Sequence, residues 1–191
     1  HYLHRRQRQM CIRDRVKGAY KLQESKKSDF GHVRILGSGP ILQYAREAAS
    51  FLESEFEISS EVWSVTSYGE LRREGMESER QNRLNPQSQK SAYVSDCFGD
   101  DTPTIAVSDY IVAVPEMIQR WVGGRFTVLG TDGFGRSDTR EELRRFFEID
   151  TKSIVLAALS TLEREGTLKE GTVKEQSEKM GISRIREDKA A

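Results

Sequence analysis

Short apolar runs alternate with segments of helical periodicity along most of the chain. Val33 to Gly37 is predicted as a strand, and the apolar residues from Ile41 to Phe56 recur at 3.6-residue spacing on one helical face. Further strands are predicted at residues 61–66, 104–109 and 125–129. Strands that alternate with helices favour right-handed crossovers and a parallel sheet covered on both faces, so the pattern predicts an α/β domain.

Helix signals fill the segments after the second and third of these strands. Ser67 and Glu70 have the spacing of a capping box, which predicts a short helix ending near Gly75. A second short helix should stop before Pro86, and a polar loop is expected from there to residue 103. Pro115 is expected to open the next helix, and the glycine pair at 123–124 to end it.

Three more helices are predicted after the last strand. The first should be capped by Asp138, with Glu141 as its partner, and should bury Leu143, Phe146 and Phe147. The second, at about 151–165, contains a run at 154–159 that is apolar enough to be buried nearly all round. The third should begin at Thr172, with Glu175 as its capping partner, and end at Gly181.

One further strand is predicted at the start of the domain, from Gly18 to Leu22. The polar segment that joins it to the strand at 33–37 is short, and a connection of this length permits only an antiparallel partner. We therefore expect the two strands to form a hairpin.

The composition is that of one soluble globular domain. The chain has 191 residues, 36% apolar and 31% charged, and this length is sufficient for a core without disulfides or metal. The two cysteines, Cys11 and Cys97, exclude a disulfide scaffold. No segment approaches the ~18 consecutive apolar residues of a membrane span, and the start lacks the apolar run of a signal peptide. We expect a cytoplasmic protein without a membrane partner.

The formal net charge of zero is unevenly distributed. Residues 1–15 carry five arginines and one aspartate, which leaves a charge of −4 on the remainder. An acidic domain binds a phosphate backbone poorly, so we expect no nucleic-acid partner. The segment at 9–15 also resembles a translated sequencing adapter. We expect residues 1–15 to be a non-native or disordered tail, 16–183 to be the domain, and 184–191 to be a frayed terminus.

Two glycine-rich segments follow strands and are candidate ligand sites. The first, Gly37-Ser38-Gly39, has the context of a dinucleotide fingerprint. However, Leu42 stands at the third glycine position, and Pro40 lacks an amide donor for a phosphate. A tight turn leading into a helix explains this segment better.

The second glycine-rich segment is the loop after the last strand. It combines three glycines with an arginine and two aspartates at a strand end, where open α/β sheets bind ligands. Its aspartates oppose an anion, so we predict that the loop packs against a neighbouring domain or subunit. Its residues are Thr131, Asp132, Gly133, Phe134, Gly135, Arg136, Ser137 and Asp138.

No residue pattern predicts catalysis or metal binding. His32 is the only histidine outside the basic tail, so no nucleophile triad can be assembled, and Cys97 has no histidine near it in the sequence. The cysteines and histidines lack the spacing of a zinc site. The acidic runs at 53–57 and 77–79 fall at solvated helical positions. We expect no catalytic, cofactor-binding or metal-binding residue.

A series of segments matches a known family in order and spacing. They are Lys17–Leu22, Leu36–Leu42, Arg46–Ala49, Val62–Ser67, Glu70–Gly75, Val128–Arg140, Leu143–Arg144 and Phe147–Asp150. Together they resemble the C-terminal domain of the homodimeric, bacterial-type pyruvate dehydrogenases, from about Val16 to the end. One departure is local: where the family has Glu-Arg-Trp-Asn and a histidine before the proline, this chain has Gln81 and Asn85.

The resemblance implies a transketolase-like C-terminal fold, a three-layer α/β/α domain whose five-stranded sheet is mostly parallel with an antiparallel first strand. In that family the full-length enzyme uses thiamine diphosphate and magnesium to decarboxylate pyruvate, and it reductively acetylates the lipoyl group of dihydrolipoyl acetyltransferase. The cofactor lies between the upstream domains, which implies that this domain binds none. The Gly-Thr-Asp-Gly sequence at 130–133 is like the start of a thiamine-diphosphate metal motif, but Ala157-Ala158 stands where the motif needs an asparagine pair.

These observations leave two main hypotheses. The first is a non-catalytic assembly domain of a pyruvate dehydrogenase, with the upstream domains, the second subunit of a homodimer and the acetyltransferase as its partners. The alternative is a freestanding anion- or nucleotide-binding regulatory module that uses the two glycine-rich segments as phosphate sites at helix N-termini. An independent hydrolase ranks last, because no nucleophile and base can be named.

Overall fold

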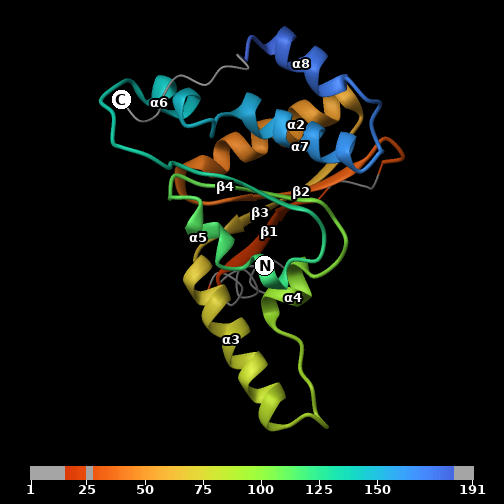
Figure 1. Cartoon of the computed structure of the whole chain (residues 1–191), viewed down its shortest axis with the longest axis vertical. Helices are drawn as coiled ribbons and strands as arrows, with labels where there is room; N and C mark the ends of the chain where they lie inside the picture. Colours follow the sequence, from red (N-terminus) through yellow and green to blue (C-terminus); the bar gives the residue numbers. More distant parts are fainter. Residues whose placement is uncertain (1–15, 25–27, 183–191) are drawn as a thin grey trace, which may run out of the picture.

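A five-stranded sheet lies between two layers of helices in a computed structural model that describes residues 16–24 and 28–182 (Figure 1). The strand order is β1-β3-β2-β4-β5, and every neighbouring pair is parallel except β1 with β3. The predicted α/β fold class is confirmed. The expectations for the ends at 1–15 and 184–191 lie outside the described residues. The strands are β1 (Ala19–Gln23), β2 (His32–Gly37), β3 (Ser59–Val65), β4 (Thr104–Val107) and β5 (Phe126–Leu129).

Strand β1 has the predicted direction but not the predicted neighbour. It pairs antiparallel with β3, with Ala19 opposite Val65, and β3 separates it from β2. The expected hairpin is therefore wrong. All seven residues of β3 are buried, which requires a neighbour on each side, whereas β1 exposes Lys21 and Leu22 and suits the edge of the sheet.

One face of the sheet is covered by helices that the sequence predicts well. Helix α2 lays a row of small residues and one leucine on the sheet (Ala45, Ala48, Ala49 and Leu52). Helix α7 packs beside α2 and is buried at most positions from Ile154 to Leu159, as expected. The elements of this layer are η1 (Gly39–Ile41), α2 (Leu42–Phe56), α6 (Arg140–Phe146), α7 (Thr151–Arg164) and α8 (Thr172–Met180).

Two predicted caps in this layer are wrong. Thr139, not Asp138, caps α6, because its hydroxyl accepts the N–H of Glu142 at 3.3 Å. Leu143, Phe146 and Phe147, which were expected to be buried, are only half-buried. Helix α8 is capped from another helix: the carboxylate of Glu163 in α7 accepts the N–H groups of Gly171 and Val173 at 3.0 and 2.7 Å. Glu175 instead pairs with Lys179 one turn further on.

The second face carries α3 (Tyr68–Leu84), α4 (Tyr93–Phe98), α5 (Ala113–Glu116) and η2 (Gln119–Trp121). Its core is aromatic, and Trp63 meets Phe98 edge-to-face with 5.0 Å between ring centroids. Ser67 caps α3 as predicted, through the N–H of Glu70. No helix in the described residues is long and apolar enough to cross a membrane.

Three predictions for this face are wrong. Helix α3 is one helix that continues past Gly75 to Leu84, because Gly75 gives room for the ring of Trp121 and does not end the helix. The expected polar loop contains α4, which buries Val94 and Phe98 but is too short for a clear periodicity. Helix α5 begins at Ala113, two residues before the proline expected to open it.

Candidate interface at the carboxyl edge of the sheet

The carboxyl ends of the parallel strands form the edge at which α/β sheets bind ligands. Strand β2 lies between β3 and β4, so the chain reverses its direction of strand addition there, and the crevice between β2 and β4 is the switch point. Four segments meet this edge: residues 37–40 after β2, 66–67 after β3, 108–111 after β4, and 130–138 after β5.

The segments on the two sides of the switch point are joined by a backbone hydrogen bond, although the buried Ser38 hydroxyl has no hydrogen-bond partner in the described residues. The N–H of Ser38 donates to the carbonyl of Val107 at 3.3 Å, and the Ser38 hydroxyl is buried. The Asp109 carboxylate comes so close to Gly39 that a Cβ built there would lie 3.6 Å from its Oδ1 atom. An anion at the start of α2 would meet this carboxylate, and Pro40 offers no N–H. The geometry disfavours a phosphate site.

The base of the predicted packing loop is tied to the loop after β4. The backbone N–H of Thr131 donates to the carbonyl of Tyr110, and its hydroxyl donates to the carbonyl of Asp109, both at 2.9 Å. The Asp132 carboxylate accepts the N–H of Val112 at 2.9 Å. Both polar side chains at the base of the loop therefore hold its shape.

The tip of the loop is exposed to solvent. Phe134 is 76% exposed, and the side chain of Arg136 turns back so that its guanidinium lies 4.7 Å from the centre of the Phe146 ring. Tyr110 and Ile111, in the neighbouring loop, are each 54% exposed. We call Tyr110, Ile111 and Phe134 the carboxyl-edge patch. Large apolar side chains exposed at one edge of a sheet are typical of a surface that a protein partner can cover.

The structure places the predicted loop residues in two groups. Thr131 and Asp132 lie in the base, whereas Phe134 lies at the exposed tip and Arg136 leads into α6. Tyr110 and Ile111 were missed by the sequence analysis. The only signal was a pair of apolar residues directly after Asp109, outside the pattern of a strand.

The described residues do not fit a magnesium and thiamine diphosphate site. None of their histidines, cysteines and carboxylates form a group of three or more that could hold a metal ion. In the segment that is like the start of the metal motif, Asp132 is committed to Val112 and Thr131 to Asp109. No chemical step can be assigned to this loop.

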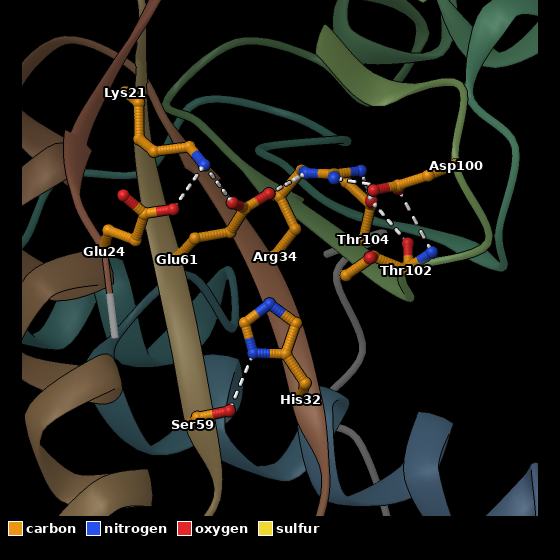
Figure 2. Close-up of polar contacts among 9 residues, drawn as sticks. All are labelled: Lys21, Glu24, His32, Arg34, Ser59, Glu61, Asp100, Thr102 and Thr104. Carbon is orange, nitrogen blue, oxygen red and sulfur yellow. Dashed lines mark hydrogen bonds and ion pairs between the residues drawn. The ribbon is translucent and has the colours of Figure 1, made fainter. Parts of the chain in front are cut away.

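Toward the opposite, amino edge, a row of charged side chains crosses the sheet (Figure 2). Arg34 is 2% exposed, forms an ion pair with Glu61, and donates to Asp100 at 2.8 Å. Glu61 also meets Lys21 at 2.7 Å. Burial raises the pKa of Glu61, but the hydrogen bond from Lys21 and the charge of Arg34 outweigh it, so the pKa is lowered overall. Each charge in the row is balanced within the domain, which is typical of a structural network.

His32 is also held structurally, at the start of β2 (Figure 2). Its Nδ1 atom lies 2.7 Å from the hydroxyl of Ser59. That hydroxyl is buried, accepts the N–H of Ser28, and donates to the carbonyl of Gly31. A hydroxyl engaged in this way ties two loops together and is not presented to a substrate. Cys97 lies half-buried in α4.

Comparisons with known proteins agree with this architecture. A family model described as the transketolase-like TK C-terminal domain matches residues 18–150. The pyruvate dehydrogenase E1 component of Pseudomonas aeruginosa is 48% identical over 170 residues, which cover 87% of this chain and 19% of that protein. That of Escherichia coli is 41% identical over 168 residues, with the same coverage of each. The chain thus spans about a fifth of the length of these relatives.

Solved structures support the same fold. The transketolase from Leishmania mexicana superimposes with a TM-score of 0.55 at 20% identity, over 83% of this chain and 20% of that one. The expected resemblance is confirmed by the family model and by the pyruvate dehydrogenase relatives. Because the family model covers most of the chain, the chain belongs to the family of transketolase-like C-terminal domains.

Proposed function

We propose that this chain is the non-catalytic, C-terminal assembly domain of a pyruvate dehydrogenase E1 component. The full-length enzyme would decarboxylate pyruvate with thiamine diphosphate and magnesium in the cytoplasm, and would reductively acetylate the lipoyl group of dihydrolipoyl acetyltransferase. The 48% identity to a pyruvate dehydrogenase E1 component supports this assignment. The observation that carries the assembly role is the carboxyl-edge patch, which presents apolar side chains where a ligand site would otherwise lie.

The path of the chain supports the preceding domains as the proposed partner at this edge. The backbone N–H groups of Thr66 and Ser67 donate to the carbonyl of Gly18 at 2.9 and 3.1 Å, so the chain enters the domain at the carboxyl edge. The preceding domains of a longer enzyme would join there and contact the loop at 131–138. The second subunit of a homodimer and the acetyltransferase are the further partners of the proposed assembly.

Activity measurements test the non-catalytic role. We expect the purified chain to show no pyruvate decarboxylation with added thiamine diphosphate and magnesium, because its described residues offer no metal-holding cluster. The full-length enzyme that contains this domain should turn over under the same conditions. Turnover by the isolated chain above the rate in buffer would contradict the proposal.

Ligand titration separates this function from an anion- or nucleotide-sensing module. A ligand present at a hundred times its dissociation constant stabilises a fold by about 2.7 kcal/mol. We expect the melting temperature of the isolated chain to stay constant with phosphate, nucleotides or thiamine diphosphate, because Asp109 opposes an anion beside Gly39. A rise that saturates with one of these ligands would favour the sensing module instead.

A further inference from the structure

The second half of α3 and the segment that returns from it form an arm that the rest of the described chain contacts only near its base, through Arg120 of η2. We define the arm as residues 76–92, and Figure 1 shows it running away from the body of the domain. None of residues 76–91 is buried. Only Ala92, where the segment rejoins the body, belongs to the core.

The arm is nevertheless held in a defined shape. Asn82 donates to the carbonyl of Lys90 at 2.9 Å and accepts the N–H of Lys90 at 2.8 Å, as a paired strand would. The hydroxyl of Ser78 donates to the same carbonyl at 3.0 Å. A short helix without apolar packing is marginally stable in water. These polar contacts therefore shape a projecting element whose exposed face remains available.

The exposed face of α3 combines arginines with apolar side chains. At 100° per residue, six side chains together with Gly69 fall within about a third of the helix circumference, on the side away from the buried Leu71 and Gly75. Arg120 of η2 adds its guanidinium, 3.8 Å from the sulfur of Met76. We call the six residues of α3, without Arg120, the arginine stripe. It consists of Arg72, Arg73, Met76, Arg80, Arg83 and Leu84, of which Met76 is 40% and Leu84 61% exposed.

The chemistry of the stripe points to an acidic protein surface. Every basic residue of α3 is an arginine, and arginine and methionine are enriched in protein interfaces, where lysine is depleted. A guanidinium also binds carboxylates in a bidentate way. Arg80 lies 3.6 Å from the exposed Glu77. Arg83 lies 3.9 Å from the half-buried Glu79, which also pairs with Arg120 at 3.0 Å. Ion pairs near the surface contribute little to stability, so the arginines can exchange them for a partner's carboxylates.

The position of the arm selects the occupant. Ser67, which caps α3, donates its N–H to Gly18, so the arm begins beside the point where the preceding chain enters the domain. The relatives are about five times longer than this chain, which supplies a large partner at that point. The acidic run at 53–57 could also contact the stripe of a second copy of this chain. Such a contact would join two different surfaces, and contacts of this kind tend to form open filaments.

We propose that the arginine stripe docks on an acidic surface of the polypeptide that precedes this domain in the full-length enzyme. The proposal rests on the proposed function, because it requires the longer enzyme. It assigns the arm a role in fixing the domain against its neighbour, in addition to the contact made by the carboxyl-edge patch.

Hydrogen exchange in two contexts tests the docking. The amide exchange of residues 76–84 is compared between the isolated chain and the full-length enzyme, where we expect it to be slower by about tenfold or more. Arg80→Gln combined with Arg83→Gln should remove most of this difference while keeping helix propensity. The control is Arg46→Gln combined with Arg164→Gln, which removes the same charge from exposed positions on the other face and should leave the protection unchanged.

Several outcomes would overturn the docking. Equal exchange in both contexts, or full protection in the Arg80→Gln/Arg83→Gln enzyme, would show that the stripe is not covered by the preceding polypeptide. Protection that rises with the concentration of the isolated chain would assign the stripe to a second copy instead. A different measurement tests the proposed function. A full-length enzyme that does not decarboxylate pyruvate would contradict it, whatever the hydrogen exchange of the arm shows.

Discussion

Gly75 illustrates how a single missing side chain determines the packing of a helix. A Cβ built at this position would lie 2.7 Å from the ring of Trp121, which is closer than van der Waals contact allows. The same residue type at Gly69, one turn and a half earlier, has only the Ser67 hydroxyl within reach, at 3.8 Å. Substitution of Gly75 therefore tests close packing against Trp121, whereas substitution of Gly69 tests helix propensity alone.

We predict that Gly75→Ala lowers the free energy of unfolding by about 1–3 kcal/mol, because the ring of Trp121 must move. Gly69→Ala should leave it unchanged or raise it by up to about 1 kcal/mol, since alanine favours helix and has room there. Urea denaturation of both variants measures the difference. Equal stabilities would show that the contact at Gly75 relaxes without cost.

The buried charge row predicts a pH dependence at a single residue, Glu61. Its pKa is lowered in the folded state, so its contribution to stability is complete above the ordinary glutamate value and is lost as the pH falls through the folded pKa. Glu61→Gln should cost about 3 kcal/mol at pH 7, because Arg34 then loses its buried carboxylate partner. The difference in the free energy of unfolding between Glu61→Gln and the unmodified chain should narrow below about pH 4.

Denaturation of Glu61→Gln at pH 7 and at pH 3 measures this dependence, with Glu55→Gln on the exposed side of α2 as the control. The control should leave the free energy of unfolding within about 0.5 kcal/mol of the unmodified chain. A gap for Glu61→Gln that stays constant between the two pH values would exclude the ionised pair as its cause.

At the scale of elements, hydrophobic periodicity predicted the helices whose apolar face packs on the sheet. It failed where the cap or the pairing of an element depends on residues of another element. Helices α2 and α7 follow the sequence pattern, because their apolar faces are continuous and lie on the sheet. The cap of α8 could not be predicted, since Glu163 comes from α7 and becomes its neighbour only through the fold. The partner of β1 depended likewise on the burial of β3 along its whole length.

The cap from Glu163 gives a prediction for α8. Glu163→Ala should lower the free energy of unfolding and speed hydrogen exchange across residues 172–180, because the N–H groups of Gly171 and Val173 lose their acceptor. Glu175→Ala removes only an exposed ion pair with Lys179 and should change both measurements little. If Glu175→Ala had the larger effect, the capping box within the helix would be the stronger determinant.

At the scale of the whole molecule, the two edges of the sheet have different chemistry. The amino edge satisfies its charges internally, through Arg34 and its partners. The carboxyl edge leaves apolar side chains exposed after β4 and β5, whereas the chain enters at the other end of this edge, next to the segment after β3. The sequence predicted the loop at 131–138 as a packing surface. It did not predict the exposure of Tyr110 and Ile111, because the exposure of residues after a strand depends on how the neighbouring loop folds over them.

This difference predicts that Phe134 matters in the assembly but not in the isolated domain. Because its side chain is 76% exposed, Phe134→Ala should change the free energy of unfolding of the isolated chain by less than about 0.5 kcal/mol. In the full-length enzyme the same change should weaken subunit or domain packing by about 2 kcal/mol if the ring is covered there. Arg136→Ala should act in the same direction, because its guanidinium supports the loop against Phe146.

Sedimentation of the full-length enzyme measures the effect of Phe134→Ala as a shift toward smaller species, and thermal unfolding measures it as an earlier transition of this domain. Phe30→Ala is the matched control: Phe30 is 57% exposed but lies just before β2, at the amino edge, where no partner is expected. An unchanged dimer and an unchanged domain transition in both loop variants would mean that the carboxyl-edge patch stays in solvent in the complete enzyme. Loss of assembly confined to the loop variants would place the contact with the rest of the enzyme at this edge.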